Sequence, residues 1–168
     1  MTDLAATVVV VSDRCYRGAE TDRTGPKLVD GLRAAGLTCP DPVVVPDDLE
    51  LIRGAVTAAI ASGTRLLIAA GGTGVSPQDI TPEAVAPLVV TPLPGLAQLL
   101  IQVSLEQTPY AALSRLVVGL TGERALLVAQ PGSVNAAETT LHHLVPLLPH
   151  LFEQLDRTEA PTGGYVEH

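Results

Sequence analysis

Two aspartates that follow predicted strands are candidates for holding a divalent cation. Asp47 comes after the apolar run Pro42–Val45, and Asp79 ends a glycine-rich loop that follows the run Arg65–Ala70. If both runs are parallel strands of one sheet, both carboxylates lie at its carboxyl edge and can share Mg²⁺ with water and nucleotide phosphate. Each aspartate also has a structural interpretation: Asp47 as a helix N-cap in a capping box with Glu50, and Asp79 as a turn residue. The sequence leaves both interpretations open.

The loop that Asp79 ends begins with three glycines in four residues, Gly71-Gly72-Thr73-Gly74. Glycine lets backbone amides approach a ligand closely and permits positive φ, and successive amides form a concavity that binds anions. The loop has neither the lysine of a phosphate-binding G-x-x-x-x-G-K-[ST] motif nor the spacing of a dinucleotide-binding G-x-G-x-x-G motif. The glycines alone are equally consistent with an anion site and with a tight connection that binds nothing.

Further polar residues stand near other predicted strands. The segment Ser12-Asp13-Arg14 leaves the first strand, and the planar guanidinium of its arginine suits phosphate. Ser114-Arg115 precedes a later strand, where the serine hydroxyl can donate to a ligand or form an ordinary turn. The turn Gln130–Ser133 follows the last predicted strand. The two cysteines and four histidines have no partner at metal-ligand spacing, and we interpret them as structural or surface residues.

The order of predicted elements indicates an α/β fold with a mostly parallel sheet covered on both faces. Buried strands are predicted at Thr7–Val11, 42–45 and 65–70, with helices from Gly25 to Gly36, from Asp47 to Gly63 and after Thr81 as N-cap. The chain continues with a proline-rich link at 91–95, a helix at 96–106 and a hairpin of strands 116–120 and 125–129. It ends with a helix from 135 to 155 that Pro146 and Pro149 disturb. We expect one domain over residues 1–155 and a mobile tail at 156–168.

Composition narrows the classes of partner. The chain of 168 residues is 46% hydrophobic but only 2% aromatic, so a full core must be built from aliphatic side chains. Its net charge of −8 argues against binding nucleic acid or an anionic membrane, and its only lysine is Lys27. An anionic ligand must therefore be held by amides, a few arginines or a metal. No membrane-spanning or signal segment is recognised, so we expect a cytoplasmic protein.

Taken together, the segments resemble the molybdopterin-binding family of molybdenum cofactor biosynthesis, which includes MogA, MoaB and the G domain of gephyrin. The matching stretches occur in the family's order from about Thr7 to Leu155. They are Val11-Ser12-Asp13-Arg14 with Gly18, Asp22 and Gly25-Pro26; Val45-Pro46-Asp47-Asp48; Gly71-Gly72-Thr73-Gly74 with Asp79-Ile80-Thr81-Pro82-Glu83-Ala84; Pro94-Gly95; Leu113-Ser114-Arg115; and Pro131-Gly132-Ser133.

This resemblance implies a three-layer α/β/α sandwich, a homotrimer and Mg²⁺-dependent transfer of AMP from ATP to the molybdopterin phosphate. It implies that Asp47 and Asp79 hold Mg²⁺–ATP as catalytic and metal-binding residues. It further implies a downstream protein that inserts molybdate into the product. The residues expected to contact substrate are Ser12, Asp13, Arg14, Gly71, Gly72, Thr73, Gly74, Ser114, Arg115, Pro131, Gly132 and Ser133.

Several positions depart from the family pattern. Gln98 and Ile101 stand near positions where the family often has Glu and Arg, and Ala129 or Gln130 replaces a frequent Asn. These losses keep a second hypothesis open, in which the chain is a non-catalytic pterin-binding or assembly subunit, an inactive MoaB-like paralogue. The helix at 96–103 is apolar on nearly all faces, so it is either buried within one chain or lies at a subunit interface.

Overall fold

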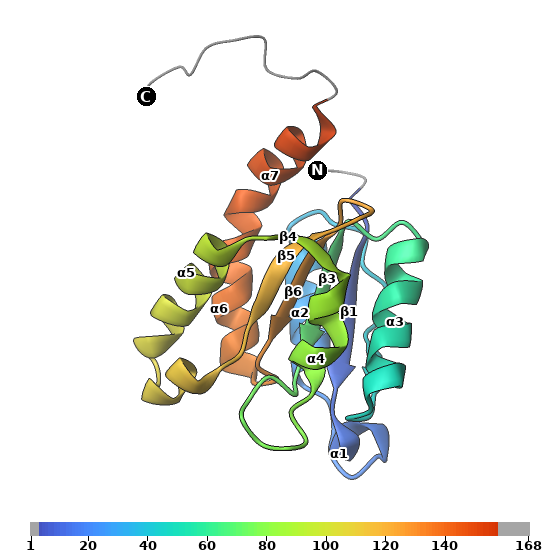
Figure 1. The fold of residues 1–168 in the computed structure, drawn as a ribbon, viewed down its shortest axis with the longest axis vertical. Coiled ribbons are helices and arrows are strands. Elements are labelled where there is room, and N and C mark those ends of the chain that lie inside the picture. Colours follow the sequence, from blue (N-terminus) through green and yellow to red (C-terminus); the bar gives the residue numbers. More distant parts are fainter. Residues whose placement is uncertain (1–3, 158–168) are drawn as a thin grey trace.

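The computed structural model describes residues 4–157 and arranges them as a six-stranded sheet between two layers of helices (Figure 1). The strand order is β2-β1-β3-β6-β5-β4. The strands are β1 (Ala6–Val11), β2 (Val43–Val45), β3 (Leu66–Ala70), β4 (Val89–Pro92), β5 (Val117–Thr121) and β6 (Leu126–Gln130). Strands β2, β1, β3 and β6 are parallel, whereas β5 pairs antiparallel with both β6 and β4 and is the one strand that runs in the opposite direction. The predicted three-layer α/β/α fold with a mostly parallel sheet is confirmed.

Each face of the sheet has its own layer of aliphatic side chains. On one face the sheet packs against α2 (Thr24–Ala34), α5 (Pro94–Leu105), α6 (Val134–Leu144) and α7 (Leu148–Asp156). On the other face it packs against α3 (Leu49–Ala61) and α4 (Thr81–Val85). Every residue of β1, β3 and β6 is buried, as expected for continuous apolar runs covered on both sides. The remaining short helices are α1 (Asp13–Tyr16), η1 (Ala86–Leu88), η2 (Pro109–Leu113) and η3 (Val145–Leu147).

Some predicted elements need correction. The link expected at 91–95 overlaps strand β4, an edge strand in which Pro92 is tolerated because one side of the strand has no ladder to complete. The segment between the predicted strand Thr7–Val11 and the predicted helix from Gly25 contains the short helix α1. The final helix is interrupted at η3, where Pro146 lies, which confirms the predicted disturbance. Asp156, expected as the first residue of a mobile tail, is the last residue of α7 instead; residues 158–168 lie outside the described residues.

None of the helices within residues 4–157 is both long enough and apolar enough to span a bilayer.

Candidate functional site

The four parallel strands end side by side, and their following loops form one edge of the molecule. The register pairs Val11 with Val45 and Ala70 with both Val10 and Gln130, so the strand ends are almost level. The loops after β1, β2, β3 and β6 are those that the sequence nominated. This edge is at the bottom of Figure 1, where α1 and the loop between β3 and α4 lie.

Asp47 is not the N-cap of the following helix, contrary to the sequence prediction. Asp48 caps α3, with its Oδ1 accepting hydrogen bonds from the amides of Glu50 (3.0 Å) and Leu51 (2.9 Å). Asp47 instead exchanges bonds with Asp13: the Asp13 amide donates to Asp47 Oδ2 (3.0 Å), and the Asp47 amide donates to Asp13 Oδ1 (3.1 Å). The reciprocal pair ties the loop after β1 to the loop after β2.

The glycine loop is wrapped tightly at its start. Gly71 has φ +118° and Gly72 has φ +62°, and a Cβ on Gly71 would lie 2.1 Å from the Val11 carbonyl oxygen. Thr81, predicted as an N-cap, is the first residue of α4 after the cap Ile80, and its hydroxyl donates to the Gly71 carbonyl at 2.7 Å. No described residue accepts a hydrogen bond from the amides of Gly72, Thr73 and Gly74. These amides are therefore free to bind an anion.

Asp47 and Asp79 lie against this same stretch of backbone. The position of a Cβ on Gly72 is 3.3 Å from Asp47 Oδ1, and the corresponding position on Gly74 is 2.8 Å from Asp79 Oδ2. The loop folds Asp79 back, because Asp79 Oδ2 accepts from the Ser76 amide (2.9 Å) and the Asp79 amide donates to the Ser76 carbonyl (3.0 Å). The two carboxylates are thus brought to residues 72 and 74 of one loop.

The electrostatics of Asp47 reflect this placement. Burial raises the pKa of Asp47, the hydrogen bond from the Asp13 amide lowers it, and the negative charges of Asp13 and Asp79 raise it further. The contribution of Asp79 means that the two site carboxylates repel each other. A divalent cation near both would remove this repulsion.

Two cavities open at this edge of the sheet. The first, of about 770 Å³, lies between the ends of β1 and β3 and the first turns of α2 and α6. The second, of about 400 Å³, lies between the glycine loop, η2 and α6. Ser133 and Asn135 line both cavities. Sequence reasoning did not nominate Lys27, which lines the first cavity and forms an ion pair with Glu138 at 2.7 Å, although its being the only lysine was a signal.

The remaining nominated residues divide between the cavities and the surface. Ser12 lines the first cavity and also caps α1 through the Cys15 amide (3.2 Å). Arg14 is 77% exposed and pairs with Glu20 at 3.2 Å. Ser114 lines the second cavity, and its buried Oγ has no hydrogen-bond partner within residues 4–157. Of the others, Gly71, Gly72 and Gly132 line the first cavity, Thr73, Gly74 and Pro131 line the second, Ser133 lines both, and Asp13 lines neither.

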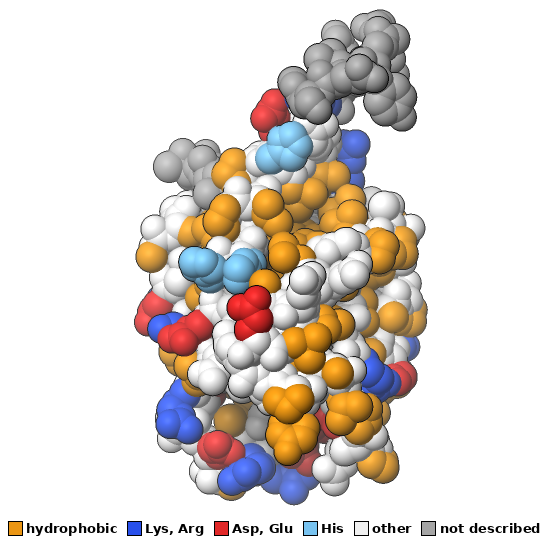
Figure 2. All heavy atoms as spheres, turned by 90° about the vertical axis from the view of Figure 1, so that its left-hand side faces the viewer, with side chains coloured by type: hydrophobic (Ala, Val, Ile, Leu, Met, Phe, Trp, Pro, Cys, Tyr) orange, Lys and Arg blue, Asp and Glu red, His pale blue; other side chains and the backbone are white. Residues whose placement is uncertain are grey.

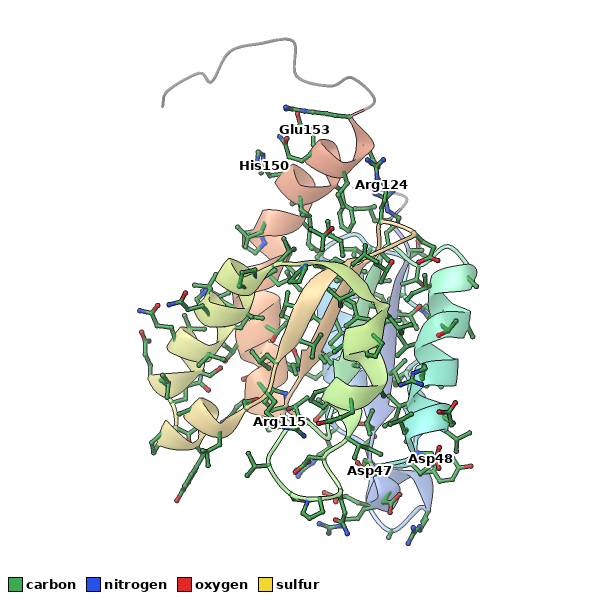
Figure 3. The ribbon with its side chains drawn as sticks, viewed as in Figure 1. Asp47, Asp48, Arg115, Arg124, His150 and Glu153 are labelled. Carbon is green, nitrogen blue, oxygen red and sulfur yellow. The ribbon has the colours of Figure 1, made fainter. Side chains whose placement is uncertain are left out.

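Arg115 does not line either cavity. Its guanidinium donates to the carbonyl oxygens of Gly74 (2.7 Å) and Asp79, and it forms an ion pair with Glu83. Figure 3 shows Arg115 beside the loop that follows β3, across from Asp47 and Asp48. The side chain expected to touch substrate thus makes its contacts with the protein itself.

The positions that depart from the family pattern line neither cavity. Gln98 and Ile101 are on α5 and line neither cavity. Ala129 is buried inside the sheet. Gln130 is only 1% exposed, and its Oε1 has no hydrogen-bond partner among the described residues.

The donor set at the strand ends limits the kind of metal. Among residues 4–157 no group of three or more His, Cys, Asp or Glu side chains could enclose an ion. Two carboxylates beside free backbone amides fit Mg²⁺, which is commonly held by one or two carboxylates with water and substrate phosphates. The arrangement therefore suits phosphoryl-type transfer, in which positioning and charge neutralisation supply most of the catalysis.

Comparison with known proteins gives a consistent result. Residues 7–150 match the family model described as a probable molybdopterin binding domain. The chain is 41% identical to a molybdenum cofactor biosynthesis bifunctional protein of Synechococcus elongatus over 86% of this chain and 45% of that protein. It is 31% identical to the molybdopterin adenylyltransferase of Pyrococcus furiosus, covering 87% of this chain and 88% of the relative.

The solved structures agree with the sequence relatives. A molybdopterin biosynthesis protein from Mycobacterium abscessus superposes with a TM-score of 0.84 at 37% identity, covering 90% of this chain and 95% of the other. The chain spans about half or less of the length of several curated relatives that it matches, including the cyanobacterial one.

Proposed function

The chain belongs to the molybdopterin-binding domain family, and we propose that it is a molybdopterin adenylyltransferase acting in molybdenum cofactor biosynthesis. The observation that carries the proposal is the placement of Asp47 and Asp79 against Gly72 and Gly74 of one loop. A relative of similar length, from Pyrococcus furiosus, is named for this activity. The two substrates are ATP and molybdopterin.

In the proposed reaction, a terminal phosphate oxygen of molybdopterin attacks the α-phosphorus of ATP. A new P–O bond forms, the bond between the α-phosphorus and its bridging oxygen breaks, and pyrophosphate leaves with that bond's electron pair. The products are adenylyl-molybdopterin and pyrophosphate. No protein nucleophile is needed, so the protein's role is to align the two phosphates and offset their charge.

Asp47 and Asp79 are the residues that would hold Mg²⁺. When bound, the cation neutralises phosphate charge and helps pyrophosphate to leave. The free amides of Gly72, Thr73 and Gly74 donate to phosphate oxygens, which an acidic chain with one lysine needs. Ser114, Pro131 and Ser133 contact molybdopterin from the second cavity, and Gly132 contacts it from the first. Ser12, Asp13 and Arg14 approach the substrates from the loop after β1.

The direct test is incubation with molybdopterin, ATP and Mg²⁺, followed by detection of adenylyl-molybdopterin. Asp79→Asn should remove most turnover, by about 100-fold or more, and weaken molybdopterin binding less, because it removes a cation ligand and leaves the second cavity intact. Asp48→Asn is the matched control, since Asn is an equally good N-cap and Asp48 faces α3. Parental turnover in Asp79→Asn would contradict the assignment.

The non-catalytic hypothesis makes a different binding prediction. An adenylyltransferase binds ATP in a Mg²⁺-dependent manner, whereas a pterin-binding subunit binds molybdopterin with little affinity for ATP. Isothermal titration with ATP, with and without Mg²⁺, separates the two. Both carboxylates and the free amides are present in this chain, which favours the enzyme.

We also propose that the molecule acts as a homotrimer that passes its product to a molybdate-inserting protein. Within one chain, Leu100 is the only buried residue among the described residues of α5. Figure 2 shows the side of the molecule on which α5 lies, where apolar side chains gather. An apolar helix with so little burial in one chain favours a subunit interface over the alternative of burial within the chain.

A further inference from the structure

Arg115 closes the loop that carries Asp79. Its backbone amide donates to the Thr73 carbonyl (2.8 Å), and its Nε donates to the Gly74 carbonyl (2.7 Å). From the same guanidinium, Nη2 donates to the Asp79 carbonyl and Nη1 to Glu83 Oε1. One residue therefore holds the loop where it leaves the glycine stretch, where it ends, and where α4 begins.

The loop has few other contacts to hold it in place. Residues 75–78 are exposed, and Val75 is 67% exposed. The bonds between Ser76 and Asp79 fold the loop tip on itself and do not attach it to the sheet. The direction of the Asp79 carboxylate therefore depends on what fixes the two ends of the loop.

A guanidinium suits this task because its donors lie in one rigid plane. Its Nε and Nη2 donate to carbonyl oxygens at two points of the loop, while Nη1 donates to a carboxylate on α4. A lysine has a single nitrogen and cannot span three acceptors in fixed directions. The ion pair with Glu83 also orients the guanidinium, and the pKa of Glu83 is lowered chiefly by its hydrogen bond from Arg115.

Helix α4 has a second, separate anchor that provides a comparison. Arg53 of α3 donates through Nε to the Ala84 carbonyl (3.1 Å) and through Nη2 to the Glu83 carbonyl (3.3 Å). Arg53 makes no hydrogen bond to residues 74–79 among the described residues. It therefore attaches the helix to α3 without touching the loop, whereas Arg115 attaches the loop.

We propose that Arg115 is a positioning residue that fixes Asp79 opposite Asp47 by binding both ends of the loop 74–79, and that Glu83 orients its guanidinium. The inference rests on the proposed function, because it takes Asp79 as a ligand of the Mg²⁺ that accompanies ATP. It replaces the sequence-based expectation that Arg115 contacts substrate, because each of the three types of guanidinium nitrogen already has a protein acceptor.

The test compares Arg115→Gln, Arg115→Lys, Glu83→Gln and the control Arg53→Gln in the full chain. The first readout is amide hydrogen exchange of residues 74–79 without substrate or metal. Arg115→Gln should speed exchange of the Ser76 and Asp79 amides by about 10-fold or more, Arg115→Lys should not rescue it, and Glu83→Gln should have a smaller effect. Arg53→Gln should leave loop exchange at the parental rate.

The second readout is the Mg²⁺ concentration that gives half-maximal adenylyl transfer. Arg115→Gln should raise it by about 10- to 100-fold, as is typical when a residue that orients a metal ligand is removed. Saturating Mg²⁺ should restore most of the kcat of Arg115→Gln and none of that of Asp79→Asn. The KM for molybdopterin should change by less than about 3-fold.

Several results would overturn the inference. They are unchanged loop exchange in Arg115→Gln, a raised KM for molybdopterin or ATP with an unchanged Mg²⁺ requirement, or equal effects of Arg53→Gln and Arg115→Gln. If the parental protein forms no adenylyl-molybdopterin, the proposed function fails. The exchange experiment still decides separately whether Arg115 holds the loop.

Discussion

At the scale of single residues, the neighbouring aspartates Asp47 and Asp48 have different roles although they are only one residue apart. Asp48 uses its carboxylate to cap α3, and this leaves Asp47 free to face Gly72 and to bond with the Asp13 amide. Asp47 stands partly buried next to two other carboxylates, and burial is the main cause of its raised pKa. A pKa raised by burial and by neighbouring charges is common at functional sites.

The raised pKa gives a prediction about stability. Since the folded-state pKa of Asp47 is above the ordinary value of 3.8, the folded chain binds the proton more tightly than the unfolded chain does. Stability therefore falls as pH rises from the ordinary value through the folded-state pKa. Without divalent cations, Asp47→Asn should have a Tm at pH 7 equal to or up to about 3 °C above the parental value, and this difference should shrink toward pH 4.

Circular dichroism melts at the two pH values measure this effect. Asp48→Ala is the control, because it removes the N-cap and should lower stability by about 1 kcal/mol at pH 7. A clear loss of Tm in Asp47→Asn at pH 7 would mean that this carboxylate stabilises the fold. Because Mg²⁺ binds the ionised form, acidification should also weaken Mg²⁺ binding at pH values where an ordinary aspartate is still charged.

At the scale of elements, the turn after β3 is shaped by backbone that only glycine can adopt. Gly71 has φ +118° and lies so close to β1 that a Cβ would clash with the Val11 carbonyl oxygen. This approach brings the glycine loop between the ends of β1 and β6, where Gly72 lies beside Asp47 and Gly74 beside Asp79. Strand, turn and α4 thus form one unit that carries half of the proposed cation site.

Gly71→Ala should destabilise the chain by about 3 kcal/mol or more, because strain at positive φ is added to a backbone clash. Gly63→Ala is the matched control: φ at Gly63 is +92°, but nothing lies within 4 Å of the added Cβ. It should cost only about 1–2 kcal/mol. Urea unfolding followed by circular dichroism suits this chain, which has no tryptophan. Equal costs for the two variants would refute the clash.

At the scale of the whole molecule, the net negative charge opposes the binding of the anionic substrates that we propose. A chain with net charge −8 repels ATP and a phosphorylated pterin over a distance, so binding depends on amides and a cation close to the site. Lys27 and Arg14 are both paired with glutamates. The proposed activity should therefore depend steeply on divalent cations.

The proposed homotrimer gives a prediction about assembly. An apolar groove of about 510 Å³ lies between α5, η3 and α7, and Leu147, which lines it, is 44% exposed. If this groove is part of an interface, Leu147→Lys should shift sedimentation at micromolar concentration from trimer toward monomer, because a lysine charge is costly to bury. Leu51→Lys, at a 51% exposed position on α3, should leave the assembly unchanged. A parental monomer would contradict the homotrimer.

Much of the fold followed from local patterns. The buried strands β1, β3 and β6 are short continuous aliphatic runs, which are recognisable because both faces of a central strand are covered. The edge strand β4 escaped prediction, since its exposed residues and Pro92 resemble a loop and its strand character comes from pairing with β5. Tertiary context decided that element.

The sequence by itself determined the buried strands, the glycine loop and the set of loops at the carboxyl edge of the sheet, because these depend on hydrophobic runs and turn residues close together in the chain. Only the tertiary structure decided that Asp48 rather than Asp47 caps α3, and that Arg115 binds the loop of Asp79. The first choice depends on cap geometry that differs by one residue. The second depends on hydrogen bonds from Arg115 to Asp79 and Gly74, which are 36 and 41 residues away in the chain, so no local sequence pattern can predict it.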